Sequence, residues 1–132
     1  VDQMKLRHWI SYLALVTMPV ITLAQSPPSV HAEPISRNLV MITRAGPNFA
    51  DRAKYGEEAR AHQAIYRQLA ANRTTIASGA FEGLPIMGMT IWSSGIDEAQ
   101  ARELIKDDKL PALGIVTYEF RVLAVREGGF EK

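Results

Sequence analysis

The sequence contains no cysteine, which excludes disulfide bridges and metal sites built on thiolates. Histidine is also scarce, and two of the three histidines, His8 and His31, lie in N-terminal segments that we expect to precede the folded domain. His62 is then the one histidine of the predicted domain, which argues against a metal site held by several histidines. We therefore predict neither a metal ion nor a cofactor.

Basic residues are not in excess, and no basic stripe with interleaved aromatic residues is present. The 132 residues carry a formal net charge of +1. Lys5, Arg7 and Asp2 all precede residue 33, so acidic and basic residues are equal in number over residues 33–132. Nucleic acid is therefore not expected as a partner, because its recognition depends on concentrated positive charge.

The N-terminal segment has the three zones of a secretory signal. A short basic start precedes an apolar run at 9–23, and small residues follow at Ala24 and Ala32. The run is short for a membrane span and contains Pro19. We expect residues 1–32 to be a signal peptide and leader that is cut near Ala24 or Ala32, which implies a periplasmic or secreted protein. The alternative is an uncleaved segment that anchors the chain, the only membrane contact that the sequence predicts.

The rest of the chain is predicted as one domain at 38–126, between a linker at 33–37 and a tail at 127–132. Hydrophobic periodicity and turn residues indicate four strands and two helices. In chain order we expect a strand at 38–43, a helix at about 50–72 that breaks near Gly56, strands at 75–80 and 86–92, a helix at 96–106 capped by Ser94, and a strand at 114–125. The order βαββαβ predicts an α+β, ferredoxin-like fold, with two helices on one face of a four-stranded antiparallel sheet.

The first helix places a titratable ring on its apolar stripe. Apolar residues recur there at helical spacing, and His62 lies among them: Tyr55, Ala59, His62, Ile65, Tyr66 and Leu69. His62 is interpreted either as a satisfied core residue or as a catalytic group aimed at the interior. Glu58, one turn earlier, is positioned to orient the ring. Asp108, after the second helix, is the second candidate partner.

The sheet face away from the helices is predicted to have mixed polarity. In the last strand, Val116, Tyr118, Phe120 and Val122 suit the helix side, which leaves Thr117, Glu119 and Arg121 on the other face. We assign Thr90 and Trp92 to that same face. A second copy of the chain packed on it would bury its apolar part and leave the polar groups lining a cavity, so a homodimer is expected. The alternative is that Glu119 and Arg121 form a solvated pair of charges.

Three segments together resemble one known family. They are His62 on the first helix, the strand end Ser78-Gly79-Ala80-Phe81 with Gly79 following His62 by 17 residues, and Asp108-Lys109-Leu110-Pro111-Ala112-Leu113-Gly114. The strand end resembles the family pattern Ala/Ser-Gly-Pro, and the segment from Asp108 resembles the family pattern Asp-Pro-aromatic-x-x-x-Gly. Residues 37–125 thus resemble a YCII-related (YciI-like) domain of the dimeric α+β barrel superfamily. The chain departs from the family pattern at Ala80, Lys109 and Leu110.

The resemblance implies a homodimer with His62 and Asp108 paired at an active site. Such a pair suits metal-independent acid/base chemistry on a small organic molecule, such as isomerisation, elimination or hydrolysis. The sequence has no cysteine and no matched serine motif, so a mechanism with a covalent nucleophile is not favoured. The alternative is a dimer of the same fold that binds a small ligand without catalysis, or a purely structural module. The predicted substrate contacts are Ser78, Gly79, Trp92, Thr117, Glu119 and Arg121.

Overall fold

The computed structural model describes residues 33–130. Its elements are strand β1 (Ser36–Ala45), a 3-10 helix η1 (Phe49–Lys54), helix α1 (Gly56–Ala71), strands β2 (Thr75–Ala80) and β3 (Met87–Trp92), helix α2 (Glu98–Leu104) and strand β4 (Val116–Val125). The predicted signal peptide and its cleavage sites near Ala24 and Ala32 lie outside the described residues. Within 33–130, no helix is long and apolar enough to cross a membrane.

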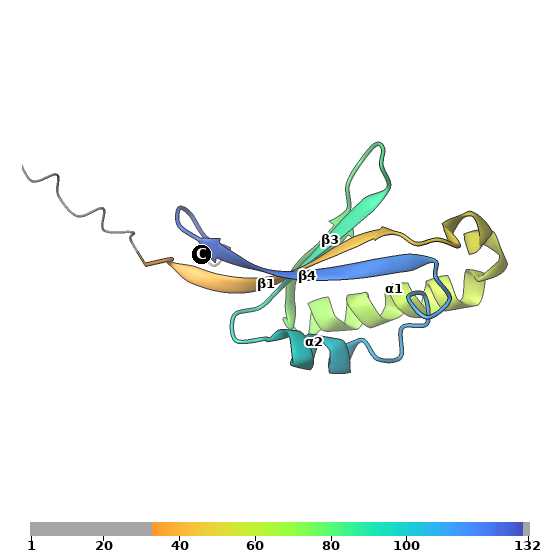
Figure 1. Cartoon of the computed structure of the whole chain (residues 1–132). Helices are drawn as coiled ribbons and strands as arrows, with labels where there is room; N and C mark the ends of the chain where they lie inside the picture. Colours follow the sequence, from red (N-terminus) through yellow and green to blue (C-terminus); the bar gives the residue numbers. More distant parts are fainter. Residues whose placement is uncertain (1–32, 131–132) are drawn as a thin grey trace, which may run out of the picture. The chain divides into compact units, whose positions relative to one another are not determined.

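The four strands form one antiparallel sheet in the order β2-β3-β1-β4. Both helices lie on the same side of this sheet (Figure 1). The α+β, ferredoxin-like prediction is therefore confirmed for the chain. The pairing of two such sheets in a dimer stays a prediction.

The boundaries of the helices follow local chemistry. The expected break near Gly56 is present, since η1 ends at Lys54 and α1 begins at Gly56. The predicted cap Ser94 is wrong. Asp97 caps α2, accepting a hydrogen bond from the Gln100 amide while the Gln100 side chain accepts one from the Asp97 amide. This reciprocal box needs Glu or Gln three residues after the cap, a condition that Asp97 meets and Ser94 does not.

The main core lies between the helices and the sheet, and it confirms the apolar stripe of α1. Its buried residues come from every layer of the fold: Leu39, Met41, Tyr66, Leu69, Trp92, Ala101 and Ile105. Trp92 is fully buried in this core, and Thr90 is buried as well. The prediction that these two residues lie on the face away from the helices is therefore wrong.

The strand register gives the reason for this error. Met41 of β1 pairs with Thr90 on one side and with Phe120 on the other. Residues paired across antiparallel strands share a face, so Thr90 lies on the helix side together with Phe120. Alternation within β3 leaves two equal choices of face, and the sequence pattern led to the wrong one.

A second, smaller core fixes the loop that joins α2 to β4. Leu110, Ile115 and Val116 are buried there, and Phe49, Tyr55, Leu113 and Tyr118 pack against them. The turn after β1 approaches this loop closely, because the amide of Gly46 donates to the carbonyl of Ile115 at 2.9 Å. A β-carbon on Gly46 would lie 2.2 Å from the Gly114 carbonyl oxygen, so only glycine fits. The loop thereby returns to the N-terminal half of α1.

Candidate acid/base site

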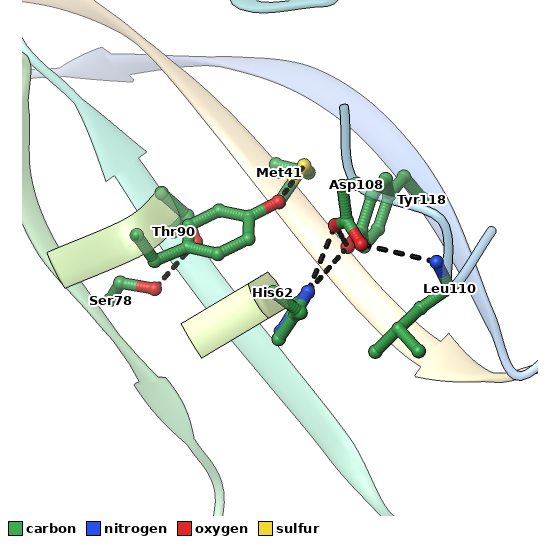
Figure 2. A network of polar contacts seen from close by, with 8 residues as sticks. Met41, His62, Ser78, Thr90, Asp108, Leu110 and Tyr118 are labelled. Atoms are coloured by element: carbon green, nitrogen blue, oxygen red, sulfur yellow. Dashed lines mark hydrogen bonds and ion pairs between the residues drawn. The ribbon is translucent and has the colours of Figure 1, made fainter. Parts of the chain in front are cut away.

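The site is centred on His62, in the second turn of α1. Its side chain is 25 % exposed, and its Nδ1 lies 2.9 Å from Oδ2 of Asp108 (Figure 2). The predicted proximity of these two side chains is confirmed. No hydrogen bond or ion pair joins Glu58 to His62 in the described part of the chain, whereas Asp108 binds Nδ1 of the ring and orients it.

Asp108 is held by the loop that follows α2. Its side chain has no solvent exposure. Oδ1 accepts the Leu110 amide at 3.2 Å, and Oδ2 accepts both the His62 ring and the Tyr118 hydroxyl. Burial on its own raises the pKa of this carboxyl, but the hydrogen bonds from His62 and Tyr118 together outweigh burial. The pKa therefore lies below its usual value, and Asp108 is a carboxylate at neutral pH.

Two tyrosines complete the polar network, and sequence reasoning did not single out either as a functional residue. The Tyr118 hydroxyl lies 3.3 Å from Nδ1 of His62 and donates to Asp108. The Tyr66 ring lies 4.8 Å from the His62 ring, between centroids, at a tilt of 52°. Burial, the main cause in both cases, raises the pKa of each phenol, so both stay protonated at neutral pH. Two features of the sequence could have identified them. Tyr118 is on the predicted helix side of the last strand, and Tyr66 is on the apolar stripe of the first helix.

The hydrogen-bond pattern selects one form of the neutral histidine ring. A carboxylate can only accept hydrogen bonds, so Nδ1 of His62 must carry the hydrogen that it shares with Asp108. Nε2 is then left with its lone pair, and it has no hydrogen-bond partner among residues 33–130. A base with a free lone pair is therefore held in a fixed orientation by a buried carboxylate.

A cavity of about 540 Å³ lies between α1 and the strands β1, β2 and β3, and His62 forms part of its wall. Asp108 is not among the residues that line it. The volume is in the range of sites for small organic molecules. The remaining lining residues include Thr43, Phe49, Gln63, Tyr66, Arg67, Ala70, Ser78, Gly79, Met87, Gly88, Met89, Thr90 and Val116.

The predicted substrate contacts divide into two groups. Ser78 and Gly79 line the cavity beside His62. Trp92 does not line it, because it is fully buried in the main core, and its assignment as a substrate contact is wrong. Thr117, Glu119 and Arg121 are also absent from the cavity wall, since their positions in β4 place them on the face away from the helices. Glu119 instead accepts hydrogen bonds from Arg44 and Arg121.

Across 33–130, no three side chains of His, Cys, Asp or Glu gather closely enough to hold a metal ion.

Comparisons of the chain with models of protein families, with curated proteins and with solved structures found no match. The YciI-like resemblance therefore stays a prediction, and the function has to be argued from the geometry of His62, Asp108 and the cavity.

Proposed function

We propose that the protein is a small enzyme that uses His62 as a general acid and base on a small organic molecule. One observation carries the proposal: Asp108 holds Nδ1 of His62, which leaves Nε2 as a free base on a ring that lines the cavity. Tyr118 supports the arrangement because it donates to the same carboxylate oxygen. A YciI-like origin of the chain would agree with these roles.

The proposed chemistry is a proton transfer. Nε2 takes a proton from carbon next to a carbonyl group, and the electron pair of the broken C–H bond moves toward the carbonyl oxygen. In an isomerisation the imidazolium returns the proton to another carbon. In an elimination the C–H electron pair forms a new C=C bond, and a leaving group on the neighbouring carbon departs with the electron pair of its own bond. In a hydrolysis Nε2 would take a proton from water while the water oxygen attacks an acyl carbon, and the imidazolium would then give that proton to the leaving alkoxide as the acyl–oxygen bond breaks. Asp108 stabilises the imidazolium in each case.

The cavity supplies a partly apolar space where a small molecule can be held against the ring. General acid/base catalysis by one positioned side chain contributes roughly 100- to 10,000-fold in rate. We expect an effect of this size from His62.

Hydrogen–deuterium exchange tests the proposal without a known substrate. The protein is incubated in D₂O with carbonyl compounds that carry acidic C–H bonds, namely pyruvate, phenylpyruvate, phenylacetone and phenylacetaldehyde, and proton NMR follows loss of the C–H signal. We expect at least one probe to exchange roughly 100-fold faster than in buffer with equal imidazole. His62→Asn should abolish this gain, because its amide still donates to Asp108 but has no basic nitrogen.

Two results would contradict the proposal. Background exchange for every probe, together with no hydrolysis of phenyl acetate, would indicate a ligand-binding protein without catalysis. A His62→Asn variant that fails to fold would instead support the interpretation of His62 as a core residue. Arg60→Gln is the matched control on α1, since Arg60 is exposed and does not line the cavity. It should retain full activity.

We also propose that two copies pair through the sheet face turned away from the helices, here called the outer face. Two rows of neighbouring residues cross β4, β1 and β3 on this face, and each row begins with a charged residue. One row is Arg121, Val40 and Ile91, and the other is Glu119, Ile42 and Met89. Such a face combines aliphatic side chains with the paired charges of Glu119 and Arg121. Val40 and Ile91 are already buried in one copy. A symmetric dimer would gain by covering the half-buried Ile42 and Met89 together with Leu123, which shares the face of Arg121 and is 42 % exposed.

Sedimentation of a chain that begins at Glu33 tests the dimer. We expect a dimer at tens of micromolar, and a shift toward monomer in Ile42→Gln, which places an amide in the middle of the outer face. Val122→Gln is the control, because Val122 is 63 % exposed but alternation in β4 places it on the helix side. A monomeric parent protein, or equal weakening by both substitutions, would contradict the proposed interface.

A further inference from the structure

The charge of the cavity wall is one-sided. Its lining residues include two arginines, Arg44 and Arg67, together with His62, and no aspartate or glutamate. Arg44 is already paired with Glu119. Within residues 33–130, the side chain of Arg67 makes no ion pair or hydrogen bond, and the residue is exposed at the cavity. An unpaired guanidinium beside a cavity without acidic groups favours an anionic ligand.

A pair of hydroxyl groups adds a further donor. The oxygens of Ser78 and Thr90 lie 2.8 Å apart, and both residues line the cavity (Figure 2). In such a pair one hydroxyl donates to the other, so the second hydroxyl keeps a hydrogen that it can donate elsewhere. Thr90 is buried, with 3 % of its surface exposed. The spare hydrogen would be satisfied by an oxygen atom of a bound ligand.

The rest of the wall is largely apolar. Phe49, Tyr66 and Val116 contribute aromatic and aliphatic surface to it. Aromatic side chains pack well against the faces of flat hydrocarbon groups. The cavity therefore combines a cationic end, a hydroxyl donor and an apolar wall, which together match an organic acid with a compact hydrocarbon body.

We propose that the ligand of this cavity is a small organic carboxylate, bound through Arg67 and placed with its reacting carbon beside His62. The guanidinium can hold a carboxylate through two parallel hydrogen bonds. Arg67 follows His62 by five residues on α1, which corresponds to about 7.5 Å along the helix axis and about 140° around it. The two side chains therefore stand at opposite edges of the helix face that lines the cavity, and the ligand would cross this face from its carboxylate to its reacting carbon. The role of His62 in this inference rests on the proposed function, whereas the role of Arg67 in binding does not.

Matched charged and neutral probes test the inference. Phenylacetate and phenylacetamide have nearly the same shape and differ in charge, and binding of each is followed by titration with two-dimensional NMR of the full chain. We expect phenylacetate to bind at least tenfold more tightly than the amide. Arg67→Gln should abolish this preference, and Arg67→Lys should retain part of it because a lysine keeps the charge but not the fork.

Arg60→Gln controls for the charge of α1 in general, since it removes one positive charge away from the cavity. The inference is overturned if the two probes bind equally, if Arg67→Gln leaves the preference unchanged, or if Arg60→Gln weakens it as much as Arg67→Gln does. His62→Asn separates the two proposals. It should lose exchange but keep the preference for phenylacetate, so a charge preference without any exchange supports the ligand class and contradicts the enzyme.

Discussion

Asp108→Asn is expected to slow proton transfer at His62 by roughly 100- to 10,000-fold while the fold stays intact. The reason lies in the three hydrogen bonds that the carboxylate accepts, from the Leu110 amide at Oδ1 and from His62 and Tyr118 at Oδ2. An amide has one accepting and one donating end, so it cannot replace a carboxylate that accepts at both ends.

Each orientation of the introduced asparagine has its own cost. If its oxygen takes the place of Oδ2, its NH₂ group faces the donating amide of Leu110. If its oxygen takes the place of Oδ1, its NH₂ group faces Nδ1 of His62, which must then become the acceptor. The ring would carry its hydrogen on Nε2 instead, and the free base at the cavity would be lost. Both orientations also remove the negative charge that stabilises the imidazolium.

Long-range proton–nitrogen NMR of the His62 ring measures this change directly. In the parent protein we expect the uncharged form of the ring to carry its hydrogen on Nδ1. In Asp108→Asn we expect a larger share of rings with the hydrogen on Nε2, since one of the two amide orientations forces it there. Exchange rates of the most reactive carbonyl probe should fall in parallel. Tyr118→Phe is the companion variant, because it removes one donor to Asp108 but keeps the carboxylate, and a smaller loss is expected. An unchanged tautomer with an unchanged rate would contradict the role assigned to Asp108.

The position of His62 could be predicted from the sequence because a helix stripe is a local property. Six residues at helical spacing fixed the buried side of α1, and the structure buries or half-buries each of them. The break near Gly56 is local in the same sense. Such features depend on neighbours three or four residues apart, which is why the sequence indicates them directly.

The approach of Asp108 could not be derived in this way. The order of helices and strands does not by itself place the start of α1 close to the end of α2. The pairing of His62 with Asp108 was therefore suggested by the family resemblance. The structure supplies the physical reason. Burial of Leu110 and Ile115 and the close approach of Gly46 to Gly114 hold the loop after α2 in place. These contacts join segments that are distant in the sequence. Tyr118 was missed as a member of the network for the same reason.

Trp92→Ala is expected to destabilise the domain by about 3–5 kcal/mol, the usual cost of truncating a large buried aromatic residue. Trp92 has no exposed surface and belongs to the main core with Leu39, Met41 and Tyr66. Its Nε1 has no hydrogen-bond partner among the described residues, so the loss would come from apolar contacts and from the cavity left behind. Small domains have about 5–15 kcal/mol of stability in total, so this loss is a large share.

Urea unfolding followed by circular dichroism measures the change in the free energy of unfolding. Thr117→Ala is the control, because Thr117 was also predicted to contact substrate but is exposed on β4, and a change within about 0.5 kcal/mol is expected. Trp92→Phe should lie between the two, since it keeps an aromatic ring in the core. If Trp92→Ala kept the stability of the parent protein and lost affinity for phenylacetate instead, Trp92 would be a ligand contact. Because Trp92 lies between the helices and the sheet, we expect Trp92→Ala to lower the stability. Binding of phenylacetate should fall only in proportion to the fraction of protein that unfolds.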